Sequence, residues 1–199
     1  MMNRYLTLAA GTLMLGATAL ATFGDSEPTI TDFVAMSGGD FDNNYGDFDI
    51  LLTAVLAADL QDVLADVDAE LTVFAPTDRA FIALARDLGY TGIDEEEAWN
   101  FLVGALTTLG GGDPIPVLTD VLTYHVLPKE VGLLPFLQAT FTGEEFVTVQ
   151  GATIDPFLFW LKDQEPDLRD PRVTFPLNRR VANGVIHSIN RVLIPVDLP

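Results

Sequence analysis

The chain has 199 residues, of which 29 are acidic and 10 are basic, so its formal net charge at pH 7 is −19. A surface this acidic repels polyanions, which excludes nucleic acid and anionic membranes as expected partners. The absence of cysteine excludes a disulfide framework and a lipid-anchored cysteine, while 49 % hydrophobic residues suffice for one packed core.

Residues 1–21 are predicted to be a signal peptide. Arg4 provides a short positive start, residues 6–20 are apolar or small, and Ala19-Leu20-Ala21 fits the small-x-small rule for cleavage. The apolar stretch is short, which favours a cleaved leader over a membrane anchor, and we expect no transmembrane segment in the mature chain. The expected organisation is a signal peptide (1–21), a linker (22–28) and one domain (29–199), exported to the periplasm or the cell exterior.

The first part of the domain is predicted to be helical. Residues 29–36 form a short amphipathic segment, and residues 48–56 place apolar side chains on one face. Asp47 precedes the second segment and is the expected cap of that helix. Helical spacing continues over residues 60–67, after a bend near Asp59.

The loop between the first two helices is acidic and partly fits the helix-loop-helix calcium pattern. Asp40, Asp42 and Asn44 occupy the first three ligand positions of that pattern. Tyr45 stands where the turn glycine belongs, and Leu51 stands where the bidentate glutamate belongs. The sequence therefore favours a solvated loop with no metal, and calcium at the first three residues stays an alternative.

The segment 71–81 changes from a strand period to a helix period. Its apolar residues alternate up to Pro76, which cannot donate to a sheet ladder and so ends the strand. Thr77 is the expected cap of the following helix, with Asp78 in its electropositive first turn. Phe81 begins the apolar face of that helix.

Further helices and then strands follow. Asp94 is the expected cap of a helix that ends at the glycines 110–112, and another helix begins near residue 113. Asn183-Gly184 is a strong turn signal before a long apolar run. The predicted strands cover residues 124–127, 146–150, 152–154, 173–175 and 185–193. Helices followed by strands indicate an α+β fold.

Three segments, in their order along the chain, resemble the fasciclin domain family. Residues 71–81 resemble its N-terminal homology box, Tyr124-His125 its central tyrosine-histidine pair, and residues 183–195 its C-terminal box. The resemblance covers roughly residues 29–197 and implies a wedge-shaped β-sandwich of two small sheets with helices packed on it. The helices between Phe81 and Tyr124 make this interval longer than in a minimal fasciclin domain.

The two histidines are predicted to be structural. His125 follows an apolar helix, His187 lies within an apolar strand, and neither has clustered metal ligands nearby in the sequence. We expect His125 to form a hydrogen bond with the turn at Thr77-Asp78, linking the central pair to the first box. The sequence also has no nucleophile elbow and no glycine-rich phosphate loop. It therefore predicts a protein that is not an enzyme, with no catalytic residue and no metal.

The fasciclin resemblance implies a secreted or cell-envelope interaction module for adhesion or matrix contact, whose partner is an extracellular or cell-surface protein or glycan. Carried over from animal matrix members, the receptor contact would fall on Tyr124, His125, Val126 and Leu127. Four consecutive apolar or aromatic positions also suit a buried strand, and we favour that interpretation. A further hypothesis is self-association between the acidic residues 25–78 and the more basic residues 162–191.

Two other functions stay open. The segment 156–161, which is either a strand with a loop or a short buried helix, includes the apolar side chains of Phe157 and Trp160. These residues would line the site of a carrier for a small apolar ligand, such as a carotenoid or lipid, or would close one end of the sandwich. A hydrolase is the least supported alternative, because no nucleophile is paired with a base.

Overall fold

The structure, a computed structural model, describes residues 27–37, 39–42 and 44–198. The predicted signal peptide and most of the predicted linker lie outside the described residues. The helices in this part of the chain are α1 (Ile30–Ala35), α2 (Asp49–Ala57), α3 (Gln61–Ala65), α4 (Asp78–Asp87), α5 (Glu95–Leu109), α6 (Ile115–Tyr124) and α7 (Leu133–Thr142). Within the described ranges, no helix has the length and apolar character needed to cross a bilayer.

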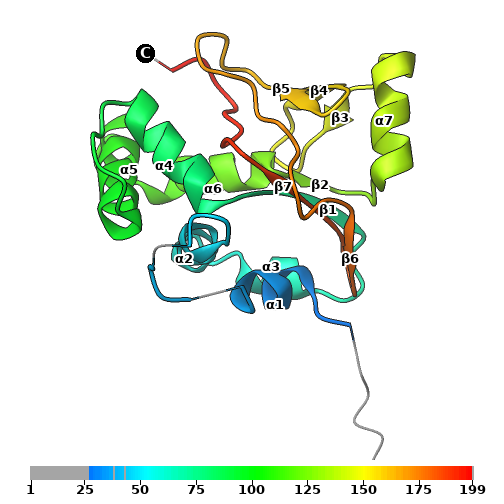
Figure 1. The fold of residues 1–199 in the computed structure, drawn as a ribbon, viewed down its shortest axis with the longest axis horizontal. Helices are drawn as coiled ribbons and strands as arrows, with labels where there is room; N and C mark the ends of the chain where they lie inside the picture. The colour runs from blue at the N-terminus through cyan, green and yellow to red at the C-terminus, as the bar shows by residue number, and fades with distance from the viewer. Residues whose placement is uncertain (1–26, 38, 43, 199) are drawn as a thin grey trace, which may run out of the picture.

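The strands form two small sheets. The four-stranded sheet has the order β2-β1-β7-β6, and the three-stranded sheet has the order β3-β4-β5. Figure 1 shows α1 to α3 on one side of the four-stranded sheet, and the three-stranded sheet with α7 on the other. The strand bounds are β1 (Leu71–Pro76), β2 (Val126–Leu127), β3 (Phe146–Val147), β4 (Thr153–Phe157), β5 (Trp160–Lys162), β6 (Arg179–Val181) and β7 (Gly184–Ile189).

The first and third sequence segments meet in the centre of the larger sheet. β1 and β7 pair in parallel from Leu71 opposite Gly184 to Pro76 opposite Ile189. Gly184 has a φ of +152°, and a Cβ built there would lie 2.0 Å from the carbonyl oxygen of Leu71. Glycine is therefore required at this position, because any side chain would collide with the neighbouring strand.

Asn183 fixes the start of β7 against the helices. Its amide group donates to the carbonyl oxygens of Leu64 and Asp66, at 2.8 and 3.0 Å, and its Oδ1 accepts from the backbone N–H of Ile30. The side chain is buried, so all three hydrogen bonds are protected from water. The predicted turn is thus also the junction of α1, α3 and β7.

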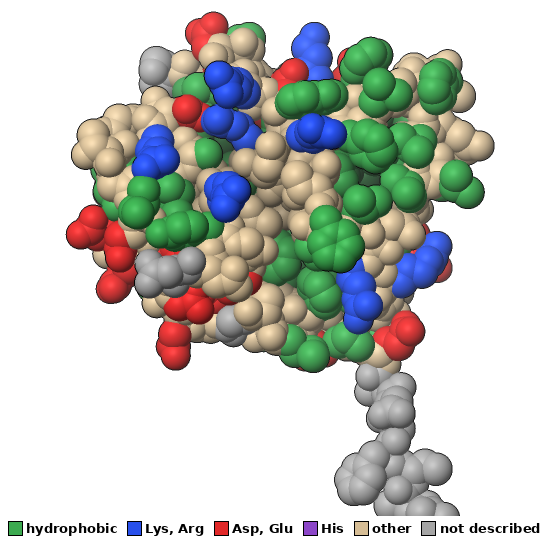
Figure 2. Space-filling view, in the orientation of Figure 1, with side chains coloured by type: hydrophobic (Ala, Val, Ile, Leu, Met, Phe, Trp, Pro, Cys, Tyr) green, Lys and Arg blue, Asp and Glu red, His purple; other side chains and the backbone are tan. Residues whose placement is uncertain are grey.

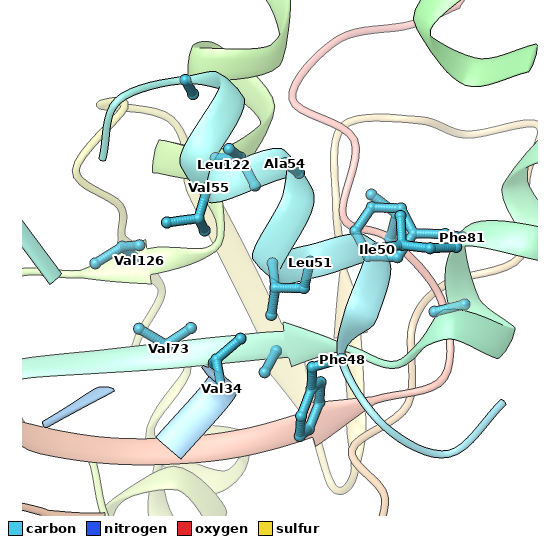
Figure 3. Close-up of a cluster of buried hydrophobic side chains, with 14 of the residues drawn as sticks. Val34, Phe48, Ile50, Leu51, Ala54, Val55, Val73, Phe81, Leu122 and Val126 are labelled. Carbon is cyan, nitrogen blue, oxygen red and sulfur yellow. The ribbon is translucent and has the colours of Figure 1, made fainter. Parts of the chain in front are cut away.

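Alternation along β1 and β7 gives the molecule two apolar cores. Val73 and Ile186 face a core built with α1, α2, α4, α5 and α6, while Phe74 and Ile189 face a second core under α7 and the smaller sheet. Figure 3 shows part of the first core, where Leu51 points from α2 toward β1. Burial on both faces explains why β1 is apolar except for Thr72, whose hydroxyl is hydrogen-bonded to Lys129 and Val131.

The structure confirms the predicted fold class, an α+β domain with two small sheets, and most predicted elements. Four strand predictions were too long. Tyr124 ends α6, so only residues 126–127 are strand, and β3 covers only residues 146–147 of the predicted 146–150. Residues 173–175 contribute a single bridge from Val173 to Ile189, and β7 stops at Ile189. The segment 156–161, left open above, contains a turn between β4 and β5.

Candidate functional site

The central tyrosine-histidine pair lies inside the molecule. Tyr124, His125, Val126 and Leu127 are all buried, and their side chains therefore offer no exposed surface to a partner. The hydroxyl of Tyr124 donates to the carbonyl oxygen of Thr153 at 2.8 Å, and burial raises the pKa of this phenol. The pair thus joins α6 to the second sheet.

His125 does not bond to the turn at Thr77-Asp78, so that prediction was wrong. Its Nδ1 lies 2.7 Å from the carbonyl oxygen of Val121, and its Nε2 lies 2.9 Å from the backbone nitrogen of Leu193. Because a carbonyl only accepts, Nδ1 carries the proton and Nε2 accepts from Leu193. Burial lowers the pKa of His125 to about 4, which keeps the ring neutral. His125 therefore ties α6 to the segment after β7.

Both ring nitrogens of His187 are also hydrogen-bonded to the backbone. Its Nε2 donates to the carbonyl oxygen of Val131 at 2.9 Å, and its Nδ1 accepts from the backbone N–H of Asn178 at 3.2 Å. The ring packs between Phe74 and Phe136, with centroids 5.9 and 5.7 Å away. Burial lowers the pKa of His187. Neither histidine of the chain has a ring nitrogen left to act as a base.

The turn between β4 and β5 carries exposed apolar side chains, and we call residues 157–160 the aromatic hairpin. Phe157 is 62 % exposed and Trp160 is 44 % exposed, with Leu158 and Phe159 exposed between them. The hairpin is held from behind, because Leu158 donates its backbone N–H to Thr140 Oγ1 of α7 at 2.8 Å. This arrangement presents the rings on a fixed backbone.

Other exposed apolar side chains lie on α7, which packs against β4, and on the segment after β5. Leu134 and Phe141 of α7 are 74 % and 80 % exposed, and Phe175 is 86 % exposed. Figure 2 shows green side chains gathered over this end of the molecule, around α7 and the smaller sheet. We call the hairpin together with these three residues the aromatic patch. A cluster of this kind is typical of an interaction surface.

A second apolar feature lies at the other end of the molecule. It is a pocket of about 310 Å³ between α4, α5, α6 and the segment after β7. Phe81, Trp99, Leu102 and Leu106 line it from the helices, and Val196 lines it from the C-terminal segment. The pocket is separate from Phe157 and Trp160, which the sequence analysis had offered as the residues of a carrier site.

Five carboxylates meet where three helices begin. Asp49, Asp78 and Glu95 are the first residues of α2, α4 and α5, and Asp42 and Asp47 come from the loop before α2. Oxygen atoms of Asp47, Asp49 and Asp78 all lie within 4.8 Å of one another, as do those of Asp42, Asp47 and Glu95. We call these five residues the carboxylate cluster.

Burial changes the acidity of the carboxylate cluster. It raises the pKa of Asp78 to about 8, with a further contribution from the hydrogen-bonded carboxyl of Asp47. Burial also raises the pKa of Glu95 to about 7, and it raises the pKa of Asp49, where the nearby charge of Asp47 adds to the effect. In each case the charged form is disfavoured because it has lost water.

The expected roles of the acidic loop are corrected in two respects. Asp47 does not cap α2; instead Asp78 accepts from the backbone N–H groups of Ile50 at 2.8 Å and Asp49 at 3.3 Å. Of the three residues considered for calcium, only Asp42 joins the cluster. Asn44 instead donates its amide to Asp47 at 2.9 Å. Thr77 occupies the predicted cap position of α4 without a side-chain cap bond.

These observations define an α+β domain that surrounds two buried histidines, exposes an aromatic patch and encloses a carboxylate cluster. A family model for the Fasciclin domain matches residues 46–195. The chain belongs to the fasciclin domain family.

Known relatives agree with this assignment. Protein sll1483 of Synechocystis sp. is 29 % identical over 148 residues, which cover 74 % of this chain and 67 % of the relative. The uncharacterized protein sll1735 of the same organism is 32 % identical over 147 residues, which cover 74 % of this chain and 89 % of the relative.

Among solved structures, a FAS1 domain pair from the insect cell adhesion molecule Fasciclin I has the same fold. The TM-score is 0.59 at 14 % sequence identity, and the match covers 85 % of this chain. It covers 51 % of the other chain, so this protein spans about half the length of that domain pair.

Proposed function

We propose that this protein is an interaction module exported from the cytoplasm, which contacts a protein or glycan at a cell surface or in the extracellular matrix. The aromatic hairpin carries the proposal, because it holds Phe157 and Trp160 in water on a fixed backbone. Rigid aromatic side chains lose little conformational entropy on binding, and they dominate binding energy at interfaces. The origin of the FAS1 domain pair in a cell adhesion molecule adds support.

The chemistry of the hairpin suits partners with apolar faces. The guanidinium of Arg172 lies 5.8 Å from the ring centroid of Trp160, so a cation stands beside the exposed ring. An aromatic ring with an adjacent donor fits an apolar protein side chain flanked by carbonyls, or the face of a sugar ring flanked by hydroxyls. The proposal assigns no catalytic step, since both imidazoles bond to the backbone.

The test compares retention on cell-envelope and matrix material from the source organism. A double variant, Phe157→Ser with Trp160→Ser, removes the exposed rings. The control is Met36→Ser with Val67→Ser, which removes two exposed apolar side chains elsewhere. We expect retention of the hairpin variant to fall about tenfold or more, with the control unchanged. Protease and periodate treatment of the material then separates a protein partner from a glycan. Equal retention of all three proteins would refute the proposal.

Self-association is a separate outcome of the same variants. If the aromatic patch joins two copies of this chain, light scattering will report a dimer for the wild type and a monomer for the hairpin variant. If the acidic and basic regions join instead, the dimer will dissociate in high salt and the hairpin substitutions will leave it intact.

A second candidate function is transport of a small apolar ligand, which the pocket beside Trp99 favours. Its volume of about 310 Å³ lies at the lower end of the range for small-molecule sites, and suits one acyl chain better than a complete carotenoid. Trp99 reports on the pocket once Trp160, the other tryptophan, is replaced by Phe. We expect fatty acid titration to change Trp99 fluorescence and Leu102→Phe, which fills the pocket without adding a tryptophan, to reduce the response. An unchanged spectrum, with no lipid recovered from the purified protein, would remove this candidate.

A further inference from the structure

The carboxylate cluster contains buried acceptor atoms that have no hydrogen-bond partner within 3.5 Å among the described residues. Asp49 is 2 % exposed and Glu95 is 1 % exposed, and Asp47 is buried as well. Both carboxylate oxygens of Asp49, together with Asp47 Oδ1 and Glu95 Oε1, have no hydrogen-bond partner among the described residues. Buried polar atoms in native proteins are almost always paired, so four unpaired oxygens at one place require a missing partner.

The cluster also lacks positive charge. None of the three salt bridges among the described residues involves one of its members. Three helices begin here, and each N-terminus contributes roughly half a positive charge. Together they offset about one and a half of the five formal negative charges. The remaining charge must be neutralised by bound protons or by a cation.

The partner of these oxygens must be a hydrogen-bond donor or a cation, because ionised carboxylates can only accept hydrogen bonds. A water would satisfy an oxygen but would leave the negative charge of the cluster uncompensated, which favours a cation. All the available atoms are hard oxygens with no nitrogen or sulfur among them, which favours calcium or magnesium over a transition metal. The oxygens in each group of three lie within 4.8 Å of one another, which is close enough for one calcium ion with ligands at about 2.3–2.6 Å to contact all three. Magnesium retains several waters, for which a buried site has little room.

We propose that the carboxylate cluster is a binding site for one calcium ion, with Asp47 shared between its two groups of ligands. Asp49 and Glu95 supply unpaired oxygens from α2 and α5, and Asp42, which is exposed, provides the path of entry from solvent. A bound ion would join the starts of these helices. The inference is independent of the aromatic patch. The cluster lies where α2, α4 and α5 begin, whereas the patch includes residues of α7, and Figure 1 shows α4 and α5 at one end of the molecule and α7 at the other.

Bound protons are the competing explanation. A shared proton can bridge Asp47 and Asp78. That proton leaves both oxygens of Asp49 and the Oε1 atom of Glu95 without a partner. The two explanations also predict different behaviour. Protons make the fold respond to pH alone, whereas a metal site makes it respond to calcium at constant pH and binds calcium in preference to magnesium.

The experiment measures thermal unfolding and isothermal titration of the chelator-treated full chain at pH 7.5 in 150 mM salt. For dissociation constants of about 0.1–1 mM, common in extracellular calcium modules, 10 mM calcium should raise the Tm by about 3–10 °C. Calorimetry should give one site per chain. Magnesium at the same concentration should raise the Tm much less, and this comparison corrects for screening of the acidic surface.

Substitutions locate the effect. Asp49→Asn and Glu95→Gln keep the side-chain shape and remove a charge, and each should abolish most of the calcium-dependent shift. The matched control is Asp167→Asn, in the acidic group of Glu165, Asp167 and Asp197. There both Glu165 oxygens already accept backbone N–H groups, from Asp167 and Leu198, so the calcium response should be unchanged.

Each alternative outcome overturns the proposal. No heat and no rise in Tm with calcium would leave protons as the neutralising partner. Equal shifts with calcium and magnesium would indicate surface screening, as would a shift retained in Asp49→Asn. If the substituted proteins do not fold, the wild-type comparison of the two cations still decides the question.

Discussion

In the carboxylate cluster, Asp49 and Glu95 hold charged groups at 2 % and 1 % exposure, whereas in the aromatic hairpin Phe157 and Trp160 hold apolar rings at 62 % and 44 % exposure. One region places charge inside and the other places apolar surface outside. Both arrangements cost free energy, but in different states. The buried carboxylates raise the free energy of the folded protein unless protons or a cation neutralise them. The exposed rings raise the free energy of the unbound protein, because they contact water when no partner covers them.

We therefore expect the cluster to affect the stability of the fold and the hairpin to affect binding. Changes in the cluster should alter the free energy of unfolding and its response to pH and calcium. Changes in the hairpin should leave stability almost unchanged and alter only what the protein contacts. Four predicted effects on the free energy of unfolding test this separation. A large effect of the hairpin on stability would contradict it.

The largest effect on stability is expected for Asp78→Ala. Asp78 accepts from two backbone N–H groups at the start of α2, and the substitution would leave those donors buried without a partner. We expect the free energy of unfolding to fall by about 2–4 kcal/mol, measured by denaturant titration. Asp49→Asn is the control, because the side chain of Asp49 has no hydrogen bond to lose.

The two substitutions should therefore differ in sign. Without calcium, Asp49→Asn removes a charge from the cluster, and its new amide can donate to Asp47 Oδ1, so stability should stay the same or rise. If both substitutions destabilise the protein equally, the cluster is a rigid hydrogen-bonded unit, and the distinction between paired and unpaired carboxylates is wrong.

The next effect is a loss of stability as pH rises. The pKa of Asp78 is raised to about 8 and that of Glu95 to about 7, from ordinary values near 4. Between pH 4 and pH 8 the unfolded chain releases protons that the folded protein retains, so its stability falls steadily over this range. The test is a series of denaturant titrations without calcium. Saturating calcium should flatten this decline, because it stabilises the ionised carboxylates.

The histidines produce the opposite slope at lower pH. The pKa of His125 falls to about 4 in the folded protein, so the unfolded chain binds a proton below about pH 6.5 that the native protein excludes. Stability should therefore decline as pH falls from 6.5 toward 4. A stability curve that rises steadily up to pH 9 without calcium would contradict the assignment of buried, protonated carboxylates.

How far the sequence predicts these regions depends on the range of the interactions. The strand-to-helix change at Pro76 and the turn at Asn183 are local signals, and both elements formed where expected. The helix α7 was not predicted, because Pro135 and the flanking glycines resemble a loop. Its spacing of Leu133, Phe136 and Leu137, with a left-handed Gly143 at its end, contained the signal.

The carboxylate cluster could not be predicted from spacing. Asp42, Asp78 and Glu95 are far apart in the chain and meet only because three helices start at one place. The helix-loop-helix calcium pattern describes ligands from one loop. It therefore included Asp42 but not Glu95, which is distant in the sequence. The bond from His125 to Leu193 spans 68 residues and carries no local signal either. Local chemistry predicted elements and caps, while long-range packing decided which side chains meet.

The smallest effect on stability is expected at the aromatic hairpin. Replacing Phe157 and Trp160 by Ser removes rings that are already largely in water, and the backbone bond from Leu158 to Thr140 is retained. The free energy of unfolding should change by less than about 1 kcal/mol, including the loss of the contact with Arg172. Denaturant titration of the double variant, beside the Met36→Ser and Val67→Ser control, measures this directly. A loss of several kcal/mol would mean that the rings close one end of the sandwich, and the patch would then be part of the fold instead of a surface for a partner.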